Sequence, residues 1–297
     1  MAFEAIMRAA QKHNVALEAL AALGARLRAD SEPLDLDPEL APLIERVVVA
    51  MGFDAATLAS LDQAQRQAAA GMIRSFFRQA AEMLEQPDRP PGWAYDDPAI
   101  LQSQGRGSRA LVPIIQQIAP TLGDLAQRLQ NPGGAFLDVG TGAGWLAMGM
   151  AAAYPRLAVV GIDIWKPALD LAAVNCAALS ERVTLREQDV AQLRDEERYD
   201  AVFLPGPFLP RPVVATAVER ARLALRQGGW LLFGLYAPID DPLSASLTDL
   251  RTVRSGGHPW AADEVVALMD AAGLTATRAF ERDWQMPMTF VAGMRPN

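Results

Sequence analysis

The segment FLDVGTGAGWLAMGM, residues 136–150, constrains the fold of this chain more than any other. An apolar run typical of a buried strand reaches Asp138, glycines follow at every second position (Gly140, Gly142 and Gly144), and apolar residues then return at helical spacing. Glycine lets the backbone turn sharply and approach a ligand closely, because it has no Cβ. Strand, glycine turn and helix in this order predict an α/β sheet with a ligand at the turn.

Strand and helix patterns alternate from this segment to the end of the chain. Strands are expected at residues 135–140, 157–163, 183–189, 199–206, 229–236, 275–284 and 288–294, with helices between most of them. The alternation predicts a mostly parallel sheet with helices on both faces. The last two strands follow each other without a helix, so we expect an antiparallel edge there. The expected fold class is therefore α/β, with a Rossmann-like, doubly wound, seven-stranded sheet.

The first part of the chain has a different pattern. Apolar residues recur there at three- and four-residue spacing, which predicts helices at residues 14–29, 39–52 and 59–84 and a helix pair at 109–129. Asp54 or Thr57 would cap the third of these helices. Residues 85–99 are dense in proline, aspartate and glycine and indicate a loop. We therefore expect two domains, a helical cap or dimerisation region at residues 1–130 and the α/β domain at residues 131–297.

The bulk composition narrows the class of partner. Acidic side chains outnumber basic ones 35 to 27, so a nucleic acid is not expected, because affinity for phosphates comes mostly from Lys and Arg. A single cysteine, Cys176, excludes a disulfide within the chain, and two histidines, His13 and His258, argue against a metal site. The N-terminus does not resemble a signal peptide and no apolar run is long enough for a membrane span, so we expect a cytoplasmic protein without a membrane partner.

Two kinds of ligand fit the glycine turn. A dinucleotide turn reads G-x-G-x-x-G/A with an acid about 20 residues later, and the chain fits this pattern from Gly142 on, with Asp163 as the acid. Against NAD, Asp138 would repel a pyrophosphate from the end of the first strand. A third acid, Asp189, ends the third strand. The glycines also repeat at two-residue spacing from Asp138 on, as D-x-G-x-G-x-G, which differs from the dinucleotide pattern.

With these three acids, residues 135–294 resemble the class I S-adenosylmethionine-dependent methyltransferases. The resemblance rests on the motifs LDVGTGAG, VVGIDIW and REQDV. It implies that the glycine loop wraps the methionine part of S-adenosylmethionine, and that Asp138 holds its ammonium group directly or through water. It also implies that Asp163 accepts from both ribose hydroxyls and Asp189 from the adenine amine, with Ile164 and Val190 on either side of the adenine ring. The cofactor-binding residues so implied are Asp138, Gly140, Thr141, Gly142, Gly144, Asp163, Ile164, Trp165, Asp189, Val190, Leu204 and Arg106.

The segment before the first strand is a second candidate region. In similar small-molecule methyltransferases this segment folds over the cofactor. Arg106 or Arg109 would then pair with the cofactor carboxylate, a geometry that arginine suits, and Trp93 and Tyr95 would line the acceptor pocket. The alternative is an ordinary interdomain loop with solvated arginines.

The residues after the fourth and fifth strands bear on the acceptor. Relatives that modify amines or bases often carry Asn or Asp after the fourth strand, whereas FLPGPFLP has Leu204 and Pro205 there, which argues against glutamine and nucleic-acid-base acceptors. Tyr236 ends the fifth strand and His258 lies in the loop that follows, so both are catalytic candidates. A histidine can take a proton from a hydroxyl during transfer. The alternatives are a core tyrosine and a polar loop histidine.

These observations predict an enzyme that transfers a methyl group from S-adenosylmethionine to a small organic acceptor, with oxygen as the first candidate for the accepting atom. Three alternatives stay open. The first is a methyltransferase that acts on a macromolecule, and the second is an enzyme that binds the same cofactor but catalyses a cyclisation or decarboxylation. The third is a nicotinamide oxidoreductase. The helical N-terminal region also makes a homodimer possible.

Overall fold

The computed structural model describes residues 1–296, which form two compact units. The first unit consists of Met1–Asp88 together with Gln102–Gln104. The second consists of Arg89–Leu101 and the chain from Gly105 onward. Within residues 1–296, no helix is long and apolar enough to cross a membrane.

The first unit is helical. Its helices are α1 (Ala2–Ala29), α2 (Ala41–Ala50), α3 (Ala55–Ala59) and α4 (Gln63–Glu85). They enclose a small apolar core of Leu27, Val48, Leu58, Ala70 and Ile73. The third expected helix is divided in two: Asp54 caps α3 through the Thr57 amide, and Asp62 begins α4 in a reciprocal capping box with Gln65. The expectation that Asp54 or Thr57 caps the long helix is therefore wrong.

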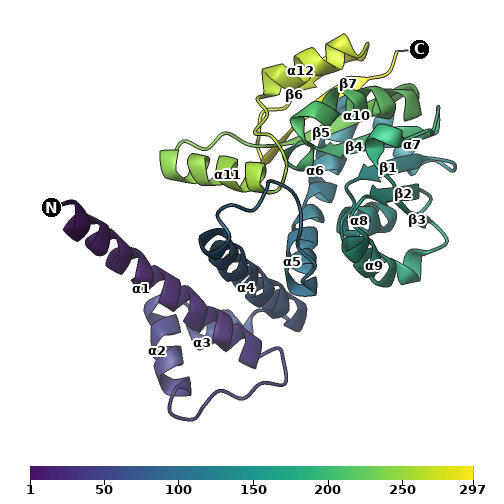
Figure 1. The fold of residues 1–297 in the computed structure, drawn as a ribbon. Coiled ribbons are helices and arrows are strands. Elements are labelled where there is room, and N and C mark those ends of the chain that lie inside the picture. Colours follow the sequence, from purple (N-terminus) through teal and green to yellow (C-terminus); the bar gives the residue numbers. More distant parts are fainter. Residues whose placement is uncertain (297) are drawn as a thin grey trace. The chain divides into compact units, whose positions relative to one another are not determined.

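The second unit contains a seven-stranded sheet (Figure 1). Its strands are β1 (Ala135–Val139), β2 (Ala158–Asp163), β3 (Val183–Glu187), β4 (Tyr199–Pro205), β5 (Leu225–Tyr236), β6 (Thr275–Ala279) and β7 (Met288–Met294). They lie in the order β3-β2-β1-β4-β5-β7-β6. The first five are parallel, and β7 pairs antiparallel with both β5 and β6. This confirms the predicted doubly wound α/β sheet with its antiparallel C-terminal edge.

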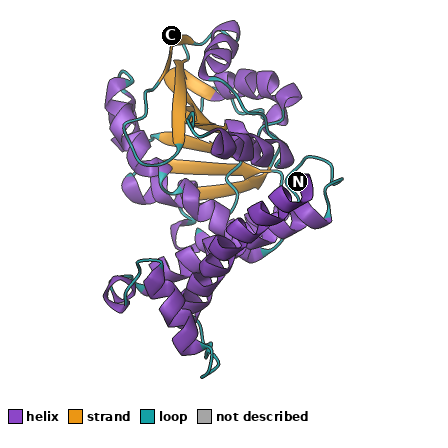
Figure 2. Ribbon diagram, turned by 90° about the vertical axis from the view of Figure 1, so that its left-hand side faces the viewer, coloured by secondary structure: helices purple, strands orange, loops and turns teal. Residues whose placement is uncertain are grey.

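Helices lie on both faces of this sheet (Figure 2). They are α6 (Leu111–Ile118), α7 (Leu125–Gln130), α8 (Trp145–Ala153), α9 (Lys166–Asn175), α10 (Arg211–Ala224) and α12 (Ala262–Ala271). Two further helices, α5 (Pro98–Ser108) and α11 (Pro242–Arg254), lie outside the apolar cores of the sheet. Short 3-10 turns are η1 (Ala119–Thr121), η2 (Ala177–Leu179), η3 (Val190–Gln192) and η4 (Gly206–Phe208).

Two apolar cores follow from the alternation of side chains along each strand. Phe136 packs in one core with residues of α6, α7 and α8, while its neighbour Leu137 packs in the other with residues of α10 and α12. Ala201 and Val202 on β4 divide between the two cores in the same way. The sheet is therefore buried on both faces, which leaves the strand ends as the places where a ligand can approach its backbone.

Two helices were not expected from the apolar spacing. Both begin with the same local signal: Asp97 precedes Pro98 in α5, and Asp241 precedes Pro242 in α11. Each aspartate accepts a hydrogen bond of 2.8 Å from a backbone amide in the first turn. An N-cap aspartate with proline at the first helical position is a recognised start signal. The strand expected at residues 275–284 is shorter, because β6 ends at Ala279.

Candidate functional site

The turn after β1 has a backbone that favours glycine. Gly140, Gly142 and Gly144 all have positive φ values, of 62°, 56° and 80°, a region that residues with a Cβ rarely adopt. A Cβ at Gly140 would lie 3.0 Å from Pro205, and one at Gly144 would lie 2.9 Å from Cys176 Sγ. At Gly142 the nearest atom would be 4.0 Å away. Two glycines are thus enclosed by protein, and Gly142 borders open space.

Hydrogen bonds tie this turn to the end of β2. The Thr141 amide donates to the Ile162 carbonyl at 3.0 Å, and the Gly142 amide donates to Asp163 Oδ2 at 2.8 Å. The Thr141 hydroxyl donates to Asp138 Oδ2 at 2.7 Å. The turn is therefore held by two of the acids that the sequence singled out.

Asp138 is an unusually buried carboxyl. It is 2% exposed and its pKa is raised to about 7. Burial is the main cause, because it disfavours the charged form; the nearby Asp163 raises the pKa further, while the Thr141 hydroxyl opposes the rise. A positive group placed beside Asp138 would restore its charged form, so the surroundings suit a cationic ligand.

The end of β2 combines a carboxylate, an exposed apolar side chain and an indole. Asp163 accepts from the Gly142 amide and, through Oδ1, from the Trp165 amide at 2.8 Å. Burial raises the pKa of Asp163, and these backbone hydrogen bonds oppose the rise. Ile164 is 69% exposed, although it directly follows a buried strand. Trp165 turns its indole Nε1 to the carbonyl of Tyr95, at 2.7 Å.

Asp189 and Val190 follow β3. Asp189 Oδ1 accepts from the Ala191 amide at 2.8 Å and so caps η3. Val190 is buried in the core on the α10 side of the sheet. Of the two apolar residues expected around an adenine ring, Ile164 therefore presents its side chain on the surface and Val190 does not.

Leu204 and Arg106 occupy different surroundings. Leu204 is fully buried in the core, and the residue after it, Pro205, packs on Gly140. Arg106 lies in the last turn of α5, with its guanidinium carbon 5.4 Å from the centroid of the Trp145 ring. Trp145 is the first residue of α8, directly after the glycine turn. The positive charge of Arg106 therefore lies beside Trp145, at the end of the glycine turn.

The three acids share one edge of the sheet. In the parallel register, Asp138 on β1 lies opposite Gly161 on β2, and Asp163 at the end of β2 lies opposite Glu187. The carboxyl ends of parallel strands on either side of a reversal in strand order form a crevice, and the order here reverses at β1 and β4. A glycine cradle, three carboxylates and an exposed isoleucine fit a ligand with hydroxyl and amine donors, a positive charge and an apolar ring.

Tyr236 and His258 line a common cavity of about 340 Å³ beyond the ends of β4 and β5. The His258 ring meets the Trp260 ring edge to face, with centroids 4.5 Å apart. Burial raises the pKa of Tyr236, against the opposing effect of Arg251, so this phenol stays neutral. The structure therefore brings the two catalytic candidates together. The remaining lining includes Pro207, Thr248, Asp249 and Trp260.

Sequence reasoning missed the part of this cavity that comes from α11. Thr248 and Asp249 belong to that helix, and the Asp241-Pro242 start signal could have revealed it. The His258 loop is fixed tightly, because a Cβ at Gly257 would lie 1.8 Å from the Pro207 carbonyl oxygen.

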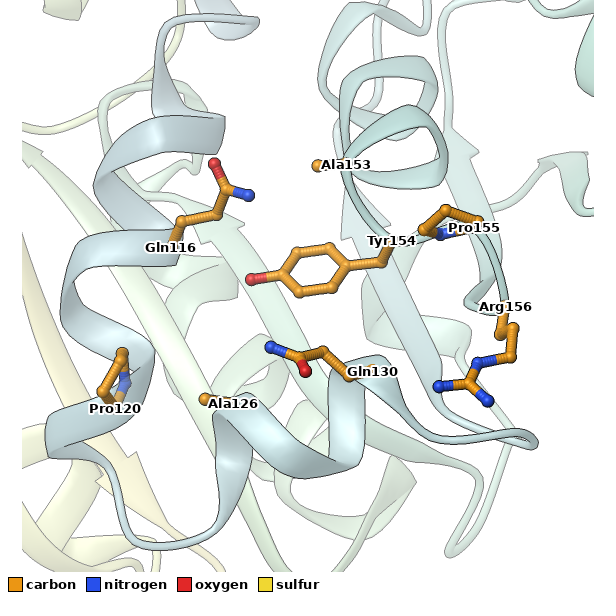
Figure 3. A pocket seen from close by; sticks show the side chains of 8 residues that line it. All are labelled: Gln116, Pro120, Ala126, Gln130, Ala153, Tyr154, Pro155 and Arg156. Atoms are coloured by element: carbon orange, nitrogen blue, oxygen red, sulfur yellow. The ribbon is translucent and has the colours of Figure 1, made fainter.

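A second cavity, of about 520 Å³, lies elsewhere in this unit (Figure 3). It is lined by Gln116, Pro120, Ala126, Gln130, Ala153, Tyr154, Pro155 and Arg156. The Tyr154 ring lies between the two glutamine side chains (Figure 3). None of the residues that the sequence singled out lines this cavity, so it is separate from the crevice at the strand ends.

Comparison with known families and proteins gives a consistent picture. Residues 136–229 match a family model described as a methyltransferase domain. The release factor glutamine methyltransferase of Rhodopirellula baltica is 30% identical over 206 residues, which cover 60% of this chain and 64% of that protein. The matched parts span between 46% and 64% of the length of this and two further curated relatives.

Solved structures resemble the chain over its full length. An O-methyltransferase family protein from Burkholderia thailandensis has a TM-score of 0.71 and 15% identity, covering 100% of this chain and 98% of that one. Human N-acetylserotonin methyltransferase, solved in complex with SAM, has a TM-score of 0.68 and 15% identity, with 98% of each chain covered. At these identities the likeness concerns the fold, including the helical N-terminal region.

Proposed function

We propose that this chain, whose residues 136–229 match a methyltransferase domain family, is an enzyme that transfers a methyl group from S-adenosylmethionine to an oxygen of a small organic acceptor. One observation carries the proposal: Asp138, Asp163 and Asp189 lie at the carboxyl ends of three successive strands, and the Gly142 amide of the glycine turn donates to Asp163. A cofactor with an ammonium, a sulfonium and a ribose diol is complementary to such an acidic crevice.

Each residue of the crevice has a proposed contact. Asp163 would accept from the ribose hydroxyls and Asp189 from the adenine amine, with Ile164 against the adenine ring. Asp138 lies deepest, and a neighbouring ammonium group would favour its charged form. Arg106 would pair with the cofactor carboxylate from the α5 side. The open space beside Gly142 would leave room for the methionine part of the cofactor.

When bound, S-adenosylmethionine supplies a methyl group already activated by the sulfonium. The task of the protein is to align the accepting oxygen with that methyl group and to exclude water, which can lower the barrier by several kcal/mol. His258, which lines the cavity beyond β4 and β5, would accept the proton of an acceptor hydroxyl. The neutral Tyr236 phenol would orient the acceptor by a hydrogen bond.

Two features support a small acceptor. A cavity of about 340 Å³ is within the size range of small-molecule sites. The strand β4 ends in Leu204 and Pro205, and both are buried, so neither offers a side-chain acceptor for the amide of a glutamine or the amine of a nucleobase. We therefore propose a small acceptor rather than the glutamine for which the relative from Rhodopirellula baltica is named.

We also propose that the protein forms a homodimer through its N-terminal helices. In the first half of α1, Phe3, Ile6 and Met7 lie on one face of the helix and all three are exposed, whereas the buried residues of this helix are Gly24 and Leu27. An exposed apolar patch of this kind marks an interaction site. Light scattering after size exclusion would give a dimer mass, and Ile6→Glu would give a monomer. A wild-type monomer at micromolar concentration would contradict the dimer.

The first experiment is calorimetric titration with S-adenosylmethionine, S-adenosylhomocysteine and NAD. Both adenosyl ligands should bind, NAD should not, and Asp163→Ala should weaken binding at least tenfold. Asp170→Ala is the matched control, because Asp170 is an exposed carboxylate on the helix after the same strand, paired with Lys166. Binding of NAD alone, or of none of the three, would overturn the proposal.

The reaction class needs a separate assay. Purified enzyme is incubated with S-adenosylmethionine and a panel of hydroxylated small molecules, each beside its amine analogue and its deoxy analogue. Production of S-adenosylhomocysteine and a methylated product with the hydroxyl compound is the expected result. Cyclised or decarboxylated product without S-adenosylhomocysteine would favour a different chemistry on the same cofactor, and methylation confined to a protein or RNA fraction would favour a macromolecular acceptor.

A further inference from the structure

Residues 89–97 cross the carboxyl edge of the sheet as an irregular segment ahead of α5, and we call this segment the strap. It contains two prolines and no regular helix or strand. In Figure 1 it is part of the dark blue chain that leads into α5. Because it lacks secondary structure of its own, its position depends on side-chain and backbone contacts to the elements around it.

The first of these contacts comes from Trp165, two residues after the end of β2. The indole Nε1 of Trp165 donates to the carbonyl of Tyr95 at 2.7 Å. The backbone amide of the same tryptophan donates to Asp163 Oδ1 at 2.8 Å. One residue therefore holds the strap with its side chain and the Asp163 carboxylate with its main chain.

The other contacts come from the far side of the crevice. The Gly92 amide donates to the Arg254 carbonyl at 2.9 Å, where α11 ends. The Trp93 ring meets the Phe208 ring edge to face, with centroids 5.9 Å apart, just after β4. The strap thus spans from the cofactor side, at β2, to the acceptor side, at β4 and α11.

We propose that Trp165 is a positioning residue that couples the Asp163 carboxylate to the strap, so that a ligand held by Asp163 keeps the strap closed over the acceptor side. The inference rests on the proposed function, because it takes the Asp163 ligand to be the adenosyl cofactor. The physical reason is that Trp165 donates both hydrogen bonds, from its main-chain amide to Asp163 and from its indole to the Tyr95 carbonyl. A ligand that orders the carboxylate also orders the tryptophan amide, and the rigid indole transmits this order to the strap.

A second consequence concerns the order of events. The cofactor would bind first and the strap would then become ordered. Trp93, in contact with Phe208, would then form one side of the acceptor pocket. A small acceptor would consequently meet a finished pocket only in the protein already loaded with cofactor. Acceptor affinity should therefore depend on the Trp165 indole N–H, although Trp165 lies on the cofactor side.

Hydrogen exchange by mass spectrometry on the full chain tests the coupling. In wild-type protein, S-adenosylhomocysteine should slow exchange both in the glycine turn, residues 140–144, and in the strap, including the Gly92 amide. Trp165→Phe keeps an aromatic ring at this position but removes the N–H donor. Without ligand, strap exchange in this variant should be about 2- to 12-fold faster, the effect of losing one net hydrogen bond. With ligand, protection should persist in the turn and be lost in the strap.

Trp284→Phe is the matched control. Trp284 also donates its indole Nε1 to a backbone carbonyl, that of Met288 at 2.6 Å, and it packs on Phe290 in the β7 region. The substitution removes the same kind of bond from the same unit without touching the strap. Its strap exchange should match the wild type, with and without ligand.

The outcomes separate the two proposals. If ligand protects neither the turn nor the strap, the proposed cofactor is wrong. If ligand protects the turn but leaves the wild-type strap unchanged, the proposed function stands and the coupling is wrong; this comparison decides even if Trp165→Phe does not fold. Normal ligand protection of the strap in a folded Trp165→Phe would also overturn the role of the indole.

Discussion

The backbone amide of Gly142 donates a hydrogen bond of 2.8 Å to the carboxylate of Asp163, across the gap between the turn after β1 and the end of β2. The two residues are 21 positions apart in the sequence. The bond holds the backbone of the glycine turn against the acid that ends the next strand in the structure without ligand. A site preformed in this way loses less entropy when it binds.

The glycine at position 142 should be required for binding more than for folding. Gly142→Ala places a Cβ at a φ of 56°, which should cost about 1–2 kcal/mol of unfolding free energy and narrow the open side of the turn. Gly273→Ala is the control, since Gly273 has a φ of 82° and no atom within 4 Å of an added Cβ. Urea unfolding should show similar losses for both variants, while calorimetry should show weaker S-adenosylhomocysteine binding only for Gly142→Ala. Equal affinity of Gly142→Ala and Gly273→Ala for S-adenosylhomocysteine would contradict a ligand at the glycine turn.

Stability should depend on pH through Asp138. An aspartate side chain ordinarily has a pKa of 3.8, and burial raises the folded value to about 7, so between these two values the unfolded chain releases a proton that the folded protein keeps. The stability contributed by this group is therefore present below pH 3.8 and lost as pH rises to about 7.

Asp138→Asn places a side chain that stays neutral at this position, so it should remove the part of the pH dependence of stability that comes from Asp138. Relative to wild type, the ligand-free variant should gain on the order of 2 kcal/mol of unfolding free energy between pH 5 and pH 8. Urea titrations of both proteins at the two pH values provide the measurement. If the difference in unfolding free energy between the two proteins is the same at pH 5 and pH 8, Asp138 is charged in the folded protein over this whole range, and the raised pKa is wrong.

The catalytic candidates should affect turnover more than cofactor binding. His258→Gln removes the proposed proton acceptor and should lower kcat about 100-fold, in the range usual for a general base. Tyr236→Phe removes a positioning hydroxyl and should act mainly on the KM of the acceptor. His13→Gln, on an exposed part of α1, is the control. The measurement is S-adenosylhomocysteine release with the best acceptor of the panel, and an unchanged kcat in His258→Gln would remove this residue from the mechanism.

An ion pair between the buried Asp200 carboxylate and the exposed Arg226 side chain, at the opposite end of the sheet, should matter for stability alone. Asp200 is 3% exposed and accepts from Arg226 Nη1 at 2.7 Å and from the Ala135 amide at 2.9 Å. Arg226→Gln weakens the pairing of a buried charge and should cost about 2 kcal/mol. Arg222→Gln, which removes a surface pair with Glu219, should cost less than about 1 kcal/mol. Thermal unfolding measures both, and equal losses would contradict the role given to Asp200.

The sequence alone was sufficient to predict the sheet and the position of the three acids at its edge. Apolar alternation is a local property, so it predicts strands such as β1 and β2 before any contact between them is known. Glycines at positions 140, 142 and 144 indicate a backbone with positive φ, which is also a local property. Parallel strands then place Asp138, Asp163 and Asp189 at one edge by geometry, which is why a ligand crevice could be inferred without coordinates.

Only the tertiary structure decided which side chains reach that crevice. Val190 and Leu204 are buried in the core, whereas Ile164 is exposed, and no spacing rule distinguishes these apolar residues. The bond from Trp165 to Tyr95 spans 70 positions, and α11 brings Asp249 to the cavity of Tyr236 and His258. Such contacts arise where segments distant in the chain pack together, and a sequence pattern encodes the burial and periodicity of each segment but not the neighbours it meets.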